Sequence, residues 1–209
     1  MNVPLLDVNA QNHPIGDELR AAFDGVLSTG RFIMGEEVEK FEASAAQYLG
    51  VKHAVGVSSG TDAILLALMA LGIGQGDEVI CPSFTFFATA GCISRTGATP
   101  VFCDSHLDSY NIDFDSAESC VTERTKAIIP VHLFGQSADM DACQVFAKKH
   151  DLIVIEDTAQ SMGARYGSQY CGSIGDFGTY SFFPSKNLGG LGDGGLLVTQ
   201  DDDLAETAI

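Results

Sequence analysis

The sequence is poor in cationic residues. Its 209 residues contain 11 lysines and arginines against 28 aspartates and glutamates, which gives a formal net charge of −17. So acidic a chain is repelled by the phosphates of nucleic acids and by anionic lipid surfaces. We therefore expect neither a nucleic-acid partner nor a membrane partner.

Paired cysteines and clustered histidines are also missing. The six cysteines include no C-x-x-C pair, several of them lie in apolar strand-like runs, and the five histidines show no metal-ligand spacing. This pattern predicts buried, reduced thiols, a cytoplasmic location and no metal site. His132 follows a strand-like run, and we interpret it as a structural histidine with satisfied hydrogen bonds.

No apolar run is long enough to cross a bilayer, because the longest covers only residues 63–73. The first residues carry Asp7, Asp17 and Glu18 and lack the uninterrupted apolar core of a signal peptide. Apolar residues make up 45% of the chain and charged residues 19%, a composition typical of a globular protein. A chain of this length can form one large α/β domain.

Short apolar runs and helical patterns alternate along the chain, which predicts parallel strands joined by crossover helices. About a dozen glycine-rich residues separate the last two runs, which is barely enough for a parallel crossover, so we expect those two strands to be antiparallel. The expected fold is a three-layer α/β sandwich with a seven-stranded sheet, of which only the last strand is reversed. The expected strands are 54–57, 78–81, 100–103, 127–131, 152–156, 177–182 and 194–199, and the clearest helices are 15–27, 35–49, 61–71, 88–95 and 140–150.

Lys186 lies between an aromatic run and a glycine-rich turn, in Tyr180-Ser181-Phe182-Phe183-Pro184-Ser185-Lys186-Asn187-Leu188. Among Phe182, Phe183 and Leu188 an ammonium would be poorly hydrated, which favours the neutral amine that can attack an aldehyde. The alternative is an ordinary lysine whose stem packs on apolar surface while its head stays in water.

Three further motifs follow strands, where α/β sheets place their ligands. Ser59-Gly60-Thr61-Asp62 can start a helix and bind phosphate through free N–H groups, or can be an ordinary helix cap. Glu156-Asp157 can pair with a protonated ring nitrogen, or can be loop acids, and Gln160 would point the same way. Phe86 can stack on a flat cofactor, or can belong to the core.

Together these motifs resemble the pyridoxal-phosphate (PLP) aminotransferases of fold type I, and most closely the DegT-type nucleotide-sugar aminotransferases. The resemblance runs through nearly the whole chain, from Gly30-Arg31-Phe32-Ile33-Met34-Gly35 through Val131-His132-Leu133-Phe134-Gly135-Gln136 to the segment 181–195. It implies that Lys186 bonds to PLP and then shuttles protons, and that Asp157 holds the pyridine nitrogen protonated. It also implies that Phe86 stacks on the ring, that Gln160 contacts the phenolic oxygen, and that Gly60, Thr61, Asp62 and Ser181 hold the phosphate.

The implied reaction moves an amino group, with glutamate as the expected donor, onto a nucleotide-linked keto-sugar for polysaccharide or amino-sugar biosynthesis. Family members form dimers, so a homodimer is expected. They are also longer, so we expect residues 1–209 to be the PLP-binding large domain with an N-terminal helical arm, from an incomplete chain without the small C-terminal domain. Two alternatives remain. One is a PLP-dependent sugar dehydratase, although in such relatives a histidine replaces the lysine; the other is a non-catalytic binding or regulatory fragment.

Overall fold

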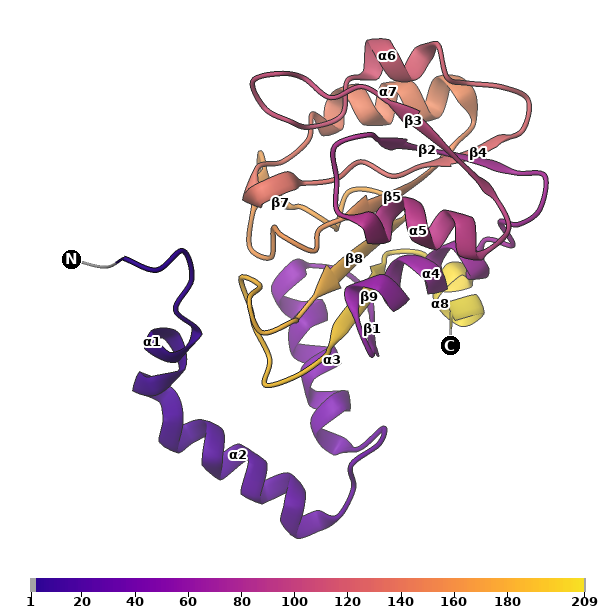
Figure 1. Cartoon of the computed structure of the whole chain (residues 1–209). Helices are drawn as coiled ribbons and strands as arrows, with labels where there is room; N and C mark the ends of the chain where they lie inside the picture. The colour runs from indigo at the N-terminus through magenta and orange to yellow at the C-terminus, as the bar shows by residue number, and fades with distance from the viewer. Residues whose placement is uncertain (1–2, 209) are drawn as a thin grey trace.

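The computed structural model describes residues 3–208 and has three layers, with a central sheet between two sets of helices (Figure 1). The strand order in the seven-stranded sheet is β1-β9-β8-β5-β4-β2-β3. The strands are β1 (His53–Val57), β2 (Glu78–Pro82), β3 (Thr99–Cys103), β4 (Thr125–Ile128), β5 (Ile153–Asp157), β8 (Phe177–Ser181) and β9 (Gly195–Thr199).

Strand β9 is the reversed strand. It pairs antiparallel with β1 and with β8, whereas the pairs β2–β3, β2–β4, β4–β5 and β5–β8 are parallel. The predicted seven-stranded sheet with an antiparallel last strand is therefore confirmed. The short connection from β8 to β9 carries Lys186, as the sequence indicated.

The helices are α1 (Val8–Asn12), α2 (Gly16–Thr29), α3 (Glu36–Leu49), α4 (Gly60–Ala70), α5 (Phe87–Arg95), α6 (Phe114–Glu118), α7 (Met140–His150) and α8 (Asp202–Ala208). Two short 3₁₀ helices, η1 (His13–Ile15) and η2 (Leu133–Gly135), and a small hairpin of β6 (Arg165–Tyr166) and β7 (Gln169–Tyr170) complete the described fold. The five helices expected most clearly are all present.

Alternate residues of the strands face different helices, because side chains of a strand point to opposite sides. Ile155 packs in the cluster formed with α4, α5 and the end of α8, while its neighbour Val154 packs with α6 and α7. Helix α3 covers β8 and β9 on the same side as α7, where Leu49 meets Tyr180. The sheet is thus buried on both faces, as expected for parallel strands.

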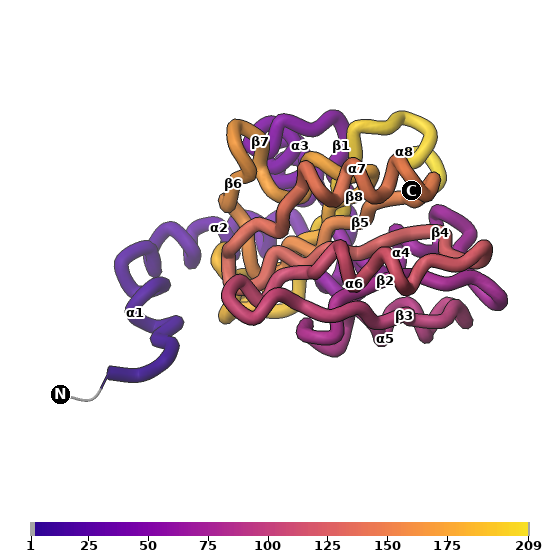
Figure 2. The backbone as a smooth tube through the Cα atoms, turned by 90° about the horizontal axis from the view of Figure 1, so that it is seen from above, coloured from indigo at the N-terminus to yellow at the C-terminus, as the bar shows by residue number. Residues whose placement is uncertain are grey.

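Helices α1 and α2 form an arm that projects from the sandwich (Figures 1 and 2). No residue of α2 is buried, and Phe23 and Leu27 on this helix are largely exposed. Helix α2 ends at Thr29, and the following Gly30, with a φ of 67°, caps it in the left-handed conformation. Among residues 3–208, no helix combines the length and the apolarity needed to span a bilayer.

Candidate active site

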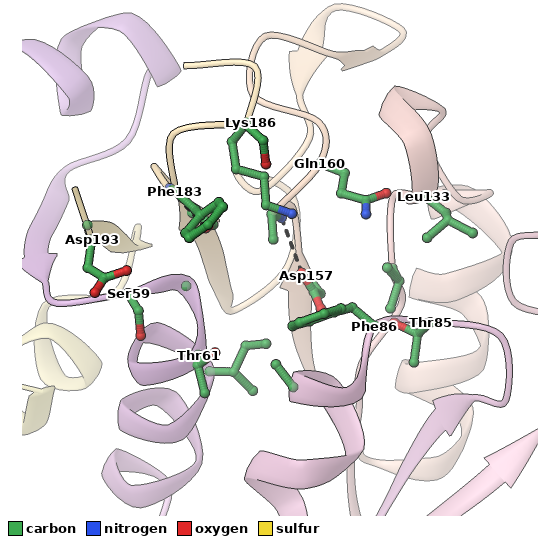
Figure 3. Close-up of a pocket in the computed structure, with 18 residues that line it drawn as sticks. Ser59, Thr61, Thr85, Phe86, Leu133, Asp157, Gln160, Phe183, Lys186 and Asp193 are labelled. Atoms are coloured by element: carbon green, nitrogen blue, oxygen red, sulfur yellow. Dashed lines mark hydrogen bonds between the residues drawn. The ribbon is translucent and has the colours of Figure 1, made fainter. Parts of the chain in front are cut away.

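A cavity of about 460 Å³ lies at the carboxyl ends of β5 and β8, beside the first turns of α4 and α5. This is the edge at which open α/β sheets bind ligands. Figure 3 shows Lys186 reaching from its loop toward Asp157, with the ring of Phe86 beside the carboxylate and Gln160 on the opposite side. Seven of the eight predicted site residues line it: Gly60, Thr61, Phe86, Asp157, Gln160, Ser181 and Lys186.

Asp157 is the last residue of β5. Among the residues that the structure describes, it is the only acidic residue of a strand that lines the cavity. Its Oδ2 accepts a hydrogen bond of 2.8 Å from the hydroxyl of Thr89, and its Oδ1 accepts one of 3.2 Å from the amide of Ala159. Burial raises the pKa of Asp157 above its ordinary value, and the Thr89 hydroxyl and the positive charge of Lys186 act in the opposite direction. A positively charged ring nitrogen placed beside this group would stabilise its ionised form.

The neighbouring acid, Glu156, faces the other side of the sheet and is fully buried. Its two oxygens accept hydrogen bonds from the amides of Gly172, Ile174 and Gly175, at 2.6–2.7 Å. They also face His132 Nε2 at 2.8 Å, and His132 Nδ1 accepts a hydrogen bond from the Ala138 amide, so the proton of this imidazole lies on Nε2. Glu156 therefore fixes the loop at 172–175, and His132 is a structural histidine as the sequence suggested.

The first turn of α4 packs closely against the ends of β8 and β9. A Cβ on Gly60 would lie 2.7 Å from Ser181 Cβ, and one on Gly195 would lie 2.3 Å from the carbonyl carbon of Ser59. Only glycine allows these approaches. They bring the Ser181 side chain to the N-terminus of α4, at one end of the cavity.

Hydrogen bonding at this N-terminus leaves the amides of two cavity-lining residues without an acceptor in the helix. The Ser59 hydroxyl accepts a hydrogen bond from the Asp62 amide, and the Ser59 carbonyl accepts one from Ala63. The amides of Gly60 and Thr61 precede these and have no acceptor within the helix. With the partial positive charge of the helix start, they form a site suited to an anion such as phosphate.

Asp62 differs from the other predicted residues because it does not line the cavity. Its amide is bonded to Ser59, and its Oδ2 accepts hydrogen bonds from the hydroxyls of Ser58 and Ser59. These bonds lower the pKa of Asp62. Its geometry fits an orienting role toward Ser59 and gives no support to a direct contact with a ligand in the cavity.

Phe86 and Gln160 lie on either side of the space in front of Lys186. Phe86 is 65% exposed, so its ring presents a free face to the cavity, and Lys186 Nζ lies 5.9 Å from the ring centroid. The Gln160 Oε1 accepts a hydrogen bond of 3.0 Å from the Phe134 amide, which leaves its NH₂ group as a donor.

The surroundings of Lys186 differ from the expectation in one respect. Only Phe183 of the three expected apolar neighbours lines the same cavity. Phe182 points into the core, where its ring meets Phe41 edge-on, and Leu188 lines a separate groove beside α3. The lysine is half-buried, so its side chain keeps some surface exposed to solvent.

Sequence reasoning missed Thr85, Thr89 and Asp193. Thr85 and Asp193 line the cavity, and Thr89 contacts Asp157 from beneath it. The motif Thr85-Phe86-Phe87-Ala88-Thr89 was a usable signal for both threonines, because it follows a strand and starts a helix at the edge where such sheets bind ligands. Asp193 sits in the glycine-rich loop before β9 and has no such signal. In the described part of the chain, no group of three or more histidine, cysteine or acidic residues could hold a metal ion.

The fold and the site together define an α/β protein with a lysine and a carboxylate facing one ligand cavity. The chain belongs to the DegT/DnrJ/EryC1/StrS aminotransferase family, whose model matches residues 13–209.

Similar proteins differ in the functions their names give. The pleiotropic regulatory protein of Geobacillus stearothermophilus is 53% identical over 99% of this chain and 55% of its own length. The dTDP-3-amino-3,4,6-trideoxy-alpha-D-glucose transaminase of Streptomyces venezuelae is 48% identical over 98% of this chain and 54% of its own. The chain thus spans about half the length of the curated relatives it matches.

Solved structures agree with the fold. DesV of S. venezuelae, crystallised in complex with a ketimine intermediate, has a TM-score of 0.95 and 48% identity, and the match covers 99% of this chain and 56% of that one. The protein NtdA of Bacillus subtilis, with bound cofactor PMP, has a TM-score of 0.92 and 37% identity, and covers 100% of this chain and 47% of that one.

Proposed function

We propose that the protein is a PLP-dependent aminotransferase that places an amino group on a nucleotide-linked keto-sugar. The observation that carries the proposal is the meeting of Lys186, Asp157 and Phe86 in one cavity with the start of α4 at its end. Its volume of about 460 Å³ is in the range of small-molecule sites. Relatives named as UDP-sugar and dTDP-sugar aminotransferases, 45–50% identical to the chain, support the substrate class.

The residues present fit PLP at both ends. The amides of Gly60 and Thr61 and the hydroxyl of Ser181 suit its phosphate, because the absence of a side chain at position 60 lets Ser181 approach the start of α4. The buried carboxyl of Asp157 suits its pyridine nitrogen, and the free face of Phe86 suits its ring. When bound, PLP supplies an aldehyde that reacts with amines and a ring that accepts electrons.

Each side chain then has a definite task. Lys186 Nζ would hold the cofactor at its aldehyde carbon, and as a free amine it would take up and return a proton in the cavity. Asp157 would hold a protonated ring nitrogen through an ion pair in a water-poor setting. Gln160 would donate its NH₂ hydrogen to the phenolic oxygen, and Phe86 would fix the plane of the ring.

The wider role is also a proposal. We take glutamate as the amino donor, a homodimer as the working form, the cytoplasm as the location, and polysaccharide or amino-sugar biosynthesis as the process. Five of the six free cysteines are buried, which fits a compartment that keeps thiols reduced.

Two other functions are supported by particular relatives. A regulatory role is suggested by the names of the Geobacillus protein and of the erythromycin biosynthesis sensory transduction protein EryC1 of Saccharopolyspora erythraea, 46% identical. A dehydratase role is suggested by the dehydratase ColD, which has a TM-score of 0.85 and 34% identity. The presence of Lys186 in the cavity favours transamination over the dehydratase role.

Isotope transfer separates the three. The protein is incubated with PLP, a nucleotide-linked keto-sugar and glutamate labelled with nitrogen-15 at the amino group, and the sugar is analysed by mass spectrometry. We expect a labelled amino-sugar, and none with Lys186→Ala. A deoxygenated sugar without nitrogen would establish the dehydratase, and binding of PLP without turnover of any keto-sugar would favour the regulatory role.

A further inference from the structure

Thr89 is hydrogen-bonded to both Phe86 and Asp157, two residues that line the cavity. Its amide donates a hydrogen bond of 3.2 Å to the carbonyl of Phe86, and its hydroxyl donates one of 2.8 Å to Asp157 Oδ2. The residue lies in the first turn of α5 and has no exposed surface. The Thr89 backbone is thus held at the start of α5 beside Phe86, while its buried hydroxyl bonds to an acid from a distant strand.

The direction of these bonds follows from the chemistry of the acid. An ionised carboxylate only accepts hydrogen bonds, so Thr89 must donate to Asp157. Its oxygen is then free to accept from the hydroxyl of Thr85, which lies 2.9 Å away and lines the cavity. The two threonines form a chain of hydroxyls that leads from the cavity wall to the buried acid.

We propose that Thr89 is a positioning residue that holds the Asp157 carboxylate ionised and aimed at the ring nitrogen of the cofactor. This inference rests on the proposed function. Thr89 does not touch the cavity itself and acts only through Asp157. Thr85 bonds to the hydroxyl of Thr89 from the cavity wall and makes no hydrogen bond to Asp157.

Other titratable groups around Asp157 do not replace this bond. The positive charge of Lys186 favours its ionised form, whereas the side chain of His132 is bonded to Glu156 and Ala138. The thiol of Cys92, on the same helix as Thr89, is kept protonated because burial raises its pKa to about 11. The Ala159 amide gives the remaining hydrogen bond to the other carboxylate oxygen. The loss of Thr89 therefore leaves Oδ2 without a protein donor among the described residues.

Cofactor-free protein gives the first test. The variants Thr89→Val and Thr85→Val are compared with the unaltered protein by urea unfolding across pH 4–8, each also in an Asp157→Asn background. The unaltered protein loses stability as pH rises through the pKa of folded Asp157. We expect this loss to continue to a higher pH in Thr89→Val, because the carboxylate has lost a hydrogen-bond donor. Thr89→Ser should restore the original dependence of stability on pH, and Thr85→Val should change it little. In the Asp157→Asn background the pH-dependent difference should vanish.

Affinity for pyridoxamine phosphate, which binds without a covalent bond to lysine, gives the second test. We expect Thr89→Val to weaken binding about tenfold or more, as the loss of one hydrogen bond to a charged group implies. An unmoved pH profile, or an equal shift in the Asp157→Asn background, would overturn the inference. If instead the profile moves but Lys186 never bonds to PLP, the proposed function fails while Thr89 still governs Asp157.

Discussion

The two adjacent carboxylates at the end of β5 offer a paired prediction, because the same chemical change should have opposite consequences at each. Glu156→Gln and Asp157→Asn both replace a buried carboxylate by an amide of nearly equal shape. Glu156 has four donors directed at it, whereas Asp157 has only one amide and one rotatable hydroxyl.

For Glu156→Gln, the amide oxygen can accept from only two of the four donors. Its NH₂ group then faces the Gly172 amide and His132 Nε2–H, and the imidazole cannot move its proton because Nδ1 already accepts from Ala138. Two hydrogen bonds to a charged group, at about 1.5–3 kcal/mol each, are lost, which lowers the free energy of unfolding by about 3–6 kcal/mol. The corresponding fall in Tm is roughly 10–20 °C.

For Asp157→Asn, the amide oxygen still accepts from Ala159, and the NH₂ group donates to Thr89, whose hydroxyl turns toward Thr85. The fold should therefore be kept. Because burial raises the pKa of Asp157 above 3.8, the folded chain binds its proton more tightly than the unfolded chain. The free energy of unfolding of the unaltered protein therefore falls as pH rises from the pKa of the unfolded chain through the raised pKa of the folded chain. The Asp157→Asn variant has no carboxyl at this position and does not show this fall.

Urea unfolding of the cofactor-free proteins at pH 4–8 measures both effects, and pyridoxamine phosphate binding reports the site. Glu156→Gln should be much less stable at every pH. Asp157→Asn should gain stability relative to the unaltered protein as pH rises, yet lose most of its affinity for the cofactor. Equal stability losses for the two variants would refute the assignment of one acid to the loop and the other to the cavity.

Two other predictions concern close packing and thiol chemistry. Gly60→Ala should weaken pyridoxamine phosphate binding and lower the free energy of unfolding in urea by about 1–3 kcal/mol, because the new Cβ meets Ser181 Cβ at 2.7 Å. The control is Gly25→Ala in α2, where a Cβ meets nothing within 4 Å, and it should raise the free energy of unfolding by about 0.5–1 kcal/mol. A larger loss at Gly25 would contradict the packing argument. In native protein a disulfide reagent at neutral pH should modify one thiol quickly, Cys120, because the other five are buried and burial raises the pKa of Cys81 and Cys103 to about 12. Rapid modification of several thiols would show that the core opens.

The sheet was predictable because each of its buried strands is a short apolar run with a helix or a tight turn on either side. The reversed strand followed from the length of its connection alone. The hairpin of β6 and β7 was not predicted, since strands of two residues carry no periodicity. Helix α8 was missed for another reason: it begins in the acidic run 201–203 and buries only Ala205 and Ala208.

The site was predictable as a set of segments and not as a set of contacts. Motifs that follow parallel strands meet at one edge of the sheet, so Asp157, Gln160 and Ser181 were brought together by topology. Glu156 and Asp157 point to opposite sides of the sheet, so only one of them can face the cavity. The apolar run that precedes them in the sequence does not show which one, because this depends on which helices cover each side. Asp157 points to the same side as Ile155, toward α4 and α5, and only the packed structure shows this.

Reductive trapping tests the central claim most directly, namely that the Lys186 amine and the Asp157 carboxyl face one bound PLP. The protein is mixed with PLP, reduced with borohydride and digested, and the labelled peptide is identified by mass spectrometry. We predict one phosphopyridoxyl group, on Lys186, with labelling strongly reduced in Asp157→Asn and absent in Lys186→Ala. Label spread over exposed lysines such as Lys52, with none on Lys186, would contradict the account.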